Sequence, residues 1–143
     1  MVVGVDVTVT ILGLAKFILD LTNGLRGLVG SVPKCQSLVE SLETLQSVLK
    51  EALKEYELFM SVAGAVLAQE LGKILLRCVQ DCDKTCKAYD ATLTKILQSK
   101  VRPLLWKISQ DDLKDLAARL EANKSTLLIN LSTIRYANEF LKF

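Results

Sequence analysis

The chain has 143 residues, half of them hydrophobic, with 18 basic and 16 acidic side chains and a formal net charge of +2. This length suits one domain with a substantial core, and so balanced a charge argues against nucleic acid as the main partner. The sequence has no histidine, the commonest acid–base catalyst, and no nucleotide-binding loop, so we expect no enzyme, no cofactor, no metal and no small-molecule substrate.

The first predicted helix begins near Val5 and ends at the glycines of positions 24, 27 and 30. Small and polar residues at steps of three or four form one narrow stripe along it, and the rest of its circumference is apolar. Such a helix must be covered by protein or by lipid. We expect it to be buried at rest against the other three long helices, with residues before about Val5 mobile. The side chains predicted to face those helices are Val7, Ile11, Leu14, Ile18 and Leu21.

This first helix is not expected to be a permanent membrane span. Its longest charge-free apolar run, from Val7 to Ala15, is shorter than the roughly 18–20 residues that a span requires. The start also lacks the basic region and cleavage site of a secretory signal, and Val2 excludes N-myristoylation. We therefore expect a cytoplasmic protein at rest, whose four cysteines stay reduced.

A second and a third helix are predicted on either side of an ambiguous segment. Pro33 fits the first turn of the second helix, in which apolar residues recur at helical spacing as far as Leu53. Residues 58–68 are apolar and contain Gly64. They are either a loop packed on the bundle or an early start of the third helix, which is clear from about Gln69.

Three cysteines, Cys78, Cys82 and Cys86, are four residues apart on the third helix and line one face at successive turns. Because they are spread over about 12 Å of helix axis, they do not converge on one metal ion. Reduced cysteine is also commonly buried as a small hydrophobic residue. We interpret the three as core residues; redox sensing or metal binding is the alternative.

A basic region follows the third helix, because no acidic residue lies between Asp90 and Asp111. One interpretation is a solvated connection between helices. The other is a contact with anionic lipid or with a partner, in which the tryptophan lies at the interface. The residues concerned are Lys95, Lys100, Arg102, Trp106 and Lys107.

The fourth helix has the clearest start, since Ser109 precedes two acidic residues in a variant of the capping box. Asn123 and Asn130 either act as partly buried polar groups that fix the register or lie at the edge of the apolar stripe. The stripe repeats every seven residues at Leu113, Leu120, Leu127, Ile134 and Leu141. The sequence thus predicts an all-α, antiparallel helical bundle of four main long helices, with room for one extra short helix, in a single domain over residues 1–143.

Several segments resemble the HeLo-like N-terminal domains of fungal STAND (NOD-like) receptors and of amyloid-controlled cell-death proteins. They are VDVTVTILGLAKFI at residues 5–18, LVESLETL at residues 38–45, the cysteine pattern of residues 78–86, the segment from Leu105 to Lys107, and the helix from Leu113 to Leu127. The likeness spans nearly the whole chain. It implies a helical bundle that forms the N-terminal part of a longer protein.

In the cell-death members of that family, activation frees the N-terminal helix, which targets and permeabilises membrane. The resemblance therefore implies a fungal effector or signalling domain of programmed cell death, in heterokaryon incompatibility or innate immunity. It would self-associate on activation and move from the cytoplasm to anionic lipid of the plasma membrane. A non-lytic protein–protein interaction domain of a STAND receptor is the alternative. The membrane-active residues would be Val5, Val7, Ile11, Leu12, Leu14, Phe17, Ile18 and Leu21.

Overall fold

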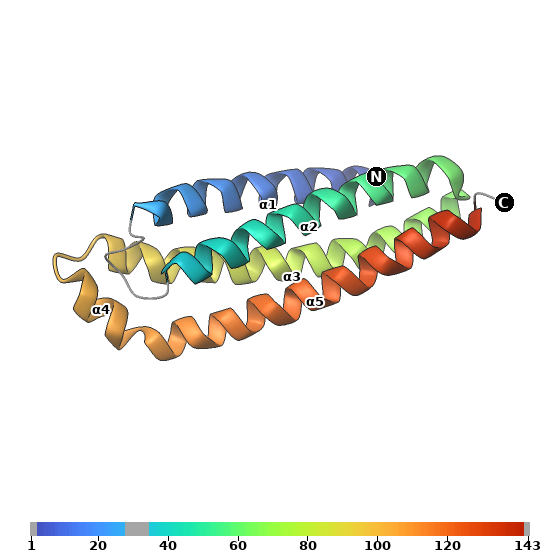
Figure 1. Cartoon of the computed structure of the whole chain (residues 1–143). Coiled ribbons are helices and arrows are strands. Elements are labelled where there is room, and N and C mark those ends of the chain that lie inside the picture. Colours follow the sequence, from blue (N-terminus) through green and yellow to red (C-terminus); the bar gives the residue numbers. More distant parts are fainter. Residues whose placement is uncertain (1–2, 28–34, 142–143) are drawn as a thin grey trace.

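The computed structural model describes residues 3–27 and 35–141, and in the first helix it describes side chains from Asp6 onward (Figure 1). These residues form five helices and no strand, which confirms the predicted all-α bundle with one extra short helix. The first helix begins at Val3, two residues before the predicted start, so residues 3 and 4 are helical and not mobile. The same expectation for residues 1–2 lies outside the described residues, as does the side chain of Val5. The helices are α1 (Val3–Arg26), α2 (Cys35–Val62), α3 (Ala65–Leu97), α4 (Arg102–Ile108) and α5 (Gln110–Leu141).

The four long helices lie side by side, and each runs antiparallel to the one that precedes it in the chain (Figure 1). Helix α5 packs along both α2 and α3, and these three helices are called here the three-helix unit. Helix α1 packs along the side of α2 and α3 that faces away from α5, and within the described residues none of its Cα atoms lies within 8 Å of one of α5. Helix α1 is thus covered at close range by α2 and α3, whereas α5 lies diagonally across a core to which all four long helices contribute.

The ambiguous segment at residues 58–68 is helical almost throughout. Helix α2 continues to Val62 and α3 already begins at Ala65, so only a two-residue turn separates them. Gly64 has extended backbone angles, φ −66° and ψ 155°. The side chain of Tyr56 is buried against this turn, and its hydroxyl donates to the carbonyl oxygen of Ala68 at 3.1 Å. The third helix thus starts earlier than its clear pattern from Gln69, as one of the two alternatives had it.

Helix α5 presents its seven-residue apolar stripe to α2 and α3. The first four members, from Leu113 to Ile134, are buried and Leu141 is half-buried. Asn123, half-buried beside the stripe, accepts a hydrogen bond of 2.6 Å from the hydroxyl of Thr85 on α3. A polar pair in an apolar interface penalises any shift that separates the two groups. The structure places Asn123 at the edge of the stripe with a hydrogen bond to α3, and its role in fixing the register stays a prediction.

A further polar group between helices was not predicted. Asn138 on α5 is buried, and its amide nitrogen donates to the backbone oxygen of Glu55 on α2 at 3.0 Å. On the same interface, the nearly buried ammonium of Lys124 pairs with Glu121 at 2.8 Å and donates to the hydroxyl of Ser41 at 3.2 Å. These contacts bind α5 to α2 along much of its length and add directional bonds to the apolar packing of the three-helix unit.

Candidate functional site

The inward face of α1 is fully covered by α2 and α3. Ile11 and Ile18 are 0% exposed, and Leu14 is 1% exposed. Together with Val7, Leu21 and Leu25 they line the inward side at helical spacing and belong to the main core. The prediction that Val7, Ile11, Leu14, Ile18 and Leu21 face other helices is confirmed.

The outward face of α1 carries apolar side chains that no other helix covers. Val9 is 64% exposed, Leu12 57% and Leu19 45%, and Phe17 at the edge is half-buried. The expectation that the apolar surface of this helix is buried at rest is therefore wrong for Leu12. The physical reason is that α1 has only two neighbours, α2 and α3, and two neighbours cannot surround a helix. The uncovered side of α1 therefore carries exposed apolar side chains together with the polar stripe, to which the exposed Lys16, Asp20 and Asn23 belong.

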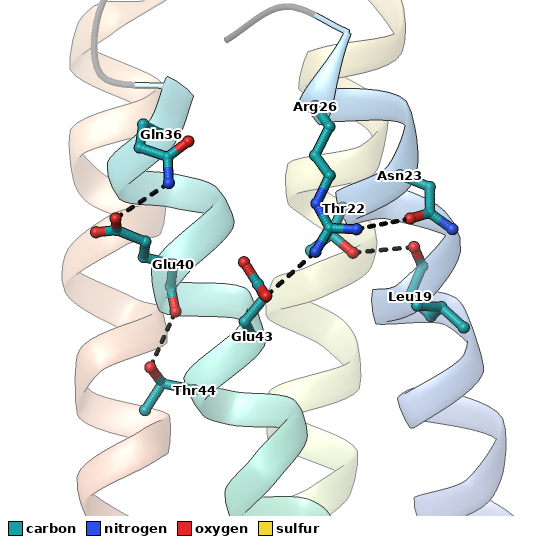
Figure 2. A network of polar contacts seen from close by, with 8 residues as sticks. All are labelled: Leu19, Thr22, Asn23, Arg26, Gln36, Glu40, Glu43 and Thr44. Carbon is teal, nitrogen blue, oxygen red and sulfur yellow. Dashed lines mark hydrogen bonds and ion pairs between the residues drawn. The ribbon is translucent and has the colours of Figure 1, made fainter.

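The polar contacts that attach α1 to the rest of the bundle include several to α2. The side-chain nitrogen of Gln46 donates to the backbone oxygen of Ala15 at 2.9 Å, and the thiol of Cys35 donates to the oxygen of Leu25 at 3.3 Å. At the end of α1, Arg26 pairs with Glu43 at 3.1 Å (Figure 2). Because both charged side chains are about half exposed, this pair contributes little. Apolar packing is therefore the main force that holds α1 in place.

Figure 2 shows how the charged end of α1 is arranged. The guanidinium of Arg26 also donates to the side-chain oxygen of Asn23 at 3.0 Å, and the hydroxyl of Thr22 donates to the backbone oxygen of Leu19 at 2.9 Å. Both bonds stay within the last turns of α1. A positive side chain at a helix C-terminus is also favourable toward the helix dipole. These local contacts stabilise the helix itself and would persist if α1 moved away from α2 as a unit.

Helix α1 is long and apolar enough to cross a bilayer. The 21 residues from Asp6 to Arg26 include a window of mean hydropathy 1.3, of which 39% is buried in the bundle. At 1.5 Å per residue, a helix of 24 residues spans about 36 Å, against about 30 Å for the hydrocarbon core. A core helix and a signal sequence share this character, so length and composition alone do not assign a membrane role.

The basic region lies at the α4 end of the bundle, and the structure corrects its predicted centre. Lys95, Lys100, Arg102 and Lys107 are exposed. Trp106, however, is only 4% exposed and is a core residue, so its ring does not lie at an interface. Because the ring of Trp106 faces the core, the residues on the opposite side of this short helix face outward. The exposed apolar residues that sequence reasoning missed here are Val101, Leu104 and Ile108, at 55%, 56% and 69% exposure.

The three cysteines of α3 are buried thiols, as the core interpretation predicted. Burial raises the pKa of Cys86 to about 12, with the charge of Asp83 adding to the effect. A hydrogen bond to Cys78 raises the pKa of Cys82 and lowers that of Cys78, because it favours the proton on Cys82. Among the described residues, no group of histidine, cysteine and carboxylate side chains is placed to hold a metal ion. The thiols therefore act here as apolar packing groups in their protonated form.

Comparison of the chain with protein-family models, with curated proteins and with solved structures finds no match. Function is therefore inferred from the geometry of α1, which has a covered inward face and exposed apolar side chains on its outward face.

Proposed function

We propose that this domain is a membrane effector of programmed cell death of the HeLo-like kind. Self-association in the cytoplasm would release α1 from α2 and α3, and α1 would then insert into the plasma membrane and permeabilise it. The observation that carries the proposal is that α1 packs on α2 and α3 alone among the described helices and leaves Val9, Leu12 and Leu19 exposed on its uncovered face. In lipid these side chains would gain the burial that protein on one side only does not give them.

The energetics allow α1 to exchange protein for lipid. Six large apolar side chains on its inward face are buried, at roughly 1.5–3 kcal/mol each, or about 9–18 kcal/mol in total. Lipid returns this burial and adds that of Leu12, Leu19 and Val9. Against it stand the charges of Asp20 and Lys16, four residues apart, which are costly in lipid unless they pair or face water. Release of α1 also uncovers the apolar side chains of α2 and α3 beneath it. Contacts between the domains of the oligomer would have to bury this surface for insertion to be favoured.

The direct test is dye release from anionic vesicles by the domain fused to an inducible oligomerisation module. Leu12→Glu changes an exposed residue, so folding is preserved. In the bilayer the new carboxylate costs about 2.5–3.5 kcal/mol, and release should fall at least about tenfold. The matched control is Leu67→Glu on α3, where the leucine is 49% exposed, close to the 57% of Leu12. Equal release by both variants, or none from the oligomerised wild-type domain, would reject the proposal.

A second candidate is a non-lytic interaction domain in which α1 never leaves the bundle. It is favoured by an apolar strip on the outward face of α5, where Tyr136 and Phe140 are 76% and 72% exposed. Leu128 and Ile129 extend it, and Ser132 lies between them in a shallow hollow. At about 200 Å² per side chain the strip exposes roughly 500 Å² of apolar surface, near the upper end for the largest patch of a monomer.

The occupant of this α5 strip would be a second copy of the chain, since one self-complementary patch is enough for a two-fold dimer. Sedimentation velocity over a range of concentrations tests this. The second candidate predicts that Phe140→Glu abolishes self-association and that the wild-type domain, when oligomerised, releases no dye. Dye release from wild-type domain would decide for the membrane effector instead.

A further inference from the structure

We infer that the α4 end of the bundle is a docking surface for an anionic phospholipid bilayer, formed by the resting domain before α1 moves. The inference rests on the proposed function in one respect, that the domain works at a membrane. It adds the surface of first contact and the orientation of the bundle on the bilayer. Its residues are Val101, Leu104 and Ile108 at the centre and Lys95, Lys100, Arg102 and Lys107 around them.

The apolar centre of this surface is fixed by the burial of Trp106. Leu104 and Ile108 are four residues apart on α4 and so share one face, while Trp106 occupies the opposite face and is buried. Because the ring cannot turn outward without leaving the core, the two aliphatic side chains cannot turn inward. At 56% and 69% exposure they project into solvent and are of the kind that enters the boundary between lipid headgroups and acyl chains.

The charges around this centre match an anionic surface. Lys95 lies in the last turn of α3, and Lys100 lies between α3 and α4. Arg102 is the first residue of α4, and Lys107 precedes Ile108 at its end. All four side chains are exposed. Arg102 reaches back to donate to the backbone oxygen of Leu97 at 3.2 Å, which closes the end of α3 and holds the positive charge at this tip. Each basic residue near an anionic leaflet adds to binding within a Debye length of the surface.

Two acidic residues follow α4 closely in the chain. Asp111 and Asp112 lie in the first turn of α5, where a helix N-terminus favours negative charge. Asp111 lines a cleft together with Ser37 of α2 and Trp106 of α4. The four basic side chains outnumber these two carboxylates, so the α4 end of the bundle keeps an excess of positive charge.

Docking through α4 would place one end of the bundle on the bilayer, with the long helices directed away from the membrane surface. Figure 1 shows that the C-terminal end of α1 lies at the same end of the bundle as α4, and that its N-terminal end lies at the opposite end. The end of α1 that is joined in the chain to α2 would therefore start at the lipid surface. A helix of about 36 Å that swings out about this end reaches the bilayer without any shift of the three-helix unit.

The test is co-sedimentation of the unoligomerised full chain with vesicles of phosphatidylcholine, with or without about 30 mol % phosphatidylserine. We expect binding to the anionic vesicles and at least about tenfold weaker partitioning by the double variant Leu104→Glu/Ile108→Glu. Lys100→Gln and Lys107→Gln should each weaken partitioning about fivefold, and binding should decline as salt is raised.

Matched controls come from exposed residues elsewhere on the bundle. Ile74→Glu on α3 replaces an isoleucine of 55% exposure, and Lys84→Gln removes an exposed lysine in the middle of α3. Both should bind like the wild-type chain, with circular dichroism and melting temperature confirming that every variant folds. Unchanged binding by Leu104→Glu/Ile108→Glu, or equal binding to vesicles without phosphatidylserine, would overturn the inference.

Two further arms separate this inference from the proposed function. Leu12→Glu on α1 should lose dye release but keep vesicle binding, because the α4 surface is intact. A polyhistidine-tagged Leu104→Glu/Ile108→Glu chain, tethered to vesicles that contain a nickel-chelating lipid, should recover dye release when oligomerised. If neither the tethered variant nor the wild-type chain releases dye when oligomerised, α1 insertion is wrong. If the untethered variant binds vesicles as the wild-type chain does, docking through α4 is wrong.

Discussion

Apolar packing is the main attachment of α1 to α2 and α3, whereas α5 is also held by hydrogen bonds from Thr85 to Asn123 and from Asn138 to the backbone of Glu55. We therefore predict that α1 can open by itself. Ile11 is 0% exposed on the inward face of α1, and α1 contacts α2 and α3 but not α5. Replacing Ile11 by alanine removes packing between α1 and the three-helix unit and leaves the α5 interfaces untouched. The perturbation should therefore raise the population of a state with α1 detached and α2, α3 and α5 still packed.

The size of the effect follows from the buried volume that is lost. Truncation of a buried isoleucine to alanine costs about 2–5 kcal/mol. With about 3 kcal/mol on the opening of α1, amide hydrogen exchange in α1 should accelerate roughly 150-fold. Exchange in α5 starts from the same native state and passes through the state in which α1 has detached. Amides of α5 should therefore accelerate by about the same factor, and a substitution on α5 is needed to tell the two openings apart.

Hydrogen exchange followed by mass spectrometry measures both regions in one sample. The matched control is Leu131→Ala, since Leu131 is 3% exposed on α5 and its loss weakens the unit on which α1 is built. Because α2, α3 and α5 are packed both before and after α1 detaches, that variant should accelerate exchange in α5 and leave exchange in α1 nearly unchanged. If Ile11→Ala fails to fold, Ile11→Val serves in its place with about 1 kcal/mol and an acceleration of about fivefold. Equal acceleration of α1 and α5 by Leu131→Ala would refute separate opening of α1.

Three further predictions concern the buried polar groups. All four thiols are buried, so a thiol reagent should label none of them quickly in the native protein and all of them in denaturant, and fast native labelling would contradict the structure. The pKa of Cys86 and of Tyr89 is raised to about 12 in the folded state. The free energy of unfolding should therefore be highest below about pH 9 and, above the unfolded-state pKa of each group, fall by about 1.4 kcal/mol per pH unit and group as the pH rises toward 12. Urea midpoints that stay constant over this range would contradict the raised pKa values. Thr85→Val and Asn123→Leu should show a coupling of about 1 kcal/mol in a double-mutant cycle of unfolding free energies, because their side chains share a hydrogen bond of 2.6 Å, and a coupling of zero would remove the register role.

The sequence by itself determined the four long helices and the face of each that packs inward. The seven-residue series from Leu113 to Leu141 can be satisfied only by a helix with one apolar side toward its neighbours. The same reasoning placed the inward residues of α1 correctly and identified the spaced cysteines of α3 as core, because burial follows from periodicity when one face is apolar and the other is not. The HeLo-like resemblance and the membrane function derived from it stay predictions.

Only the tertiary structure decided which apolar surfaces remain uncovered. Periodicity cannot choose the outward side of a helix that is apolar nearly all round, so the exposure of Leu12 depended on α1 having two neighbours rather than three. In a helix of seven residues, sequence gives no preferred face, and the packing of Trp106 into the core is what turned Leu104 and Ile108 outward. Burial of one side of a helix is a local property of its sequence, whereas exposure of the other side depends on how many elements the fold places around it.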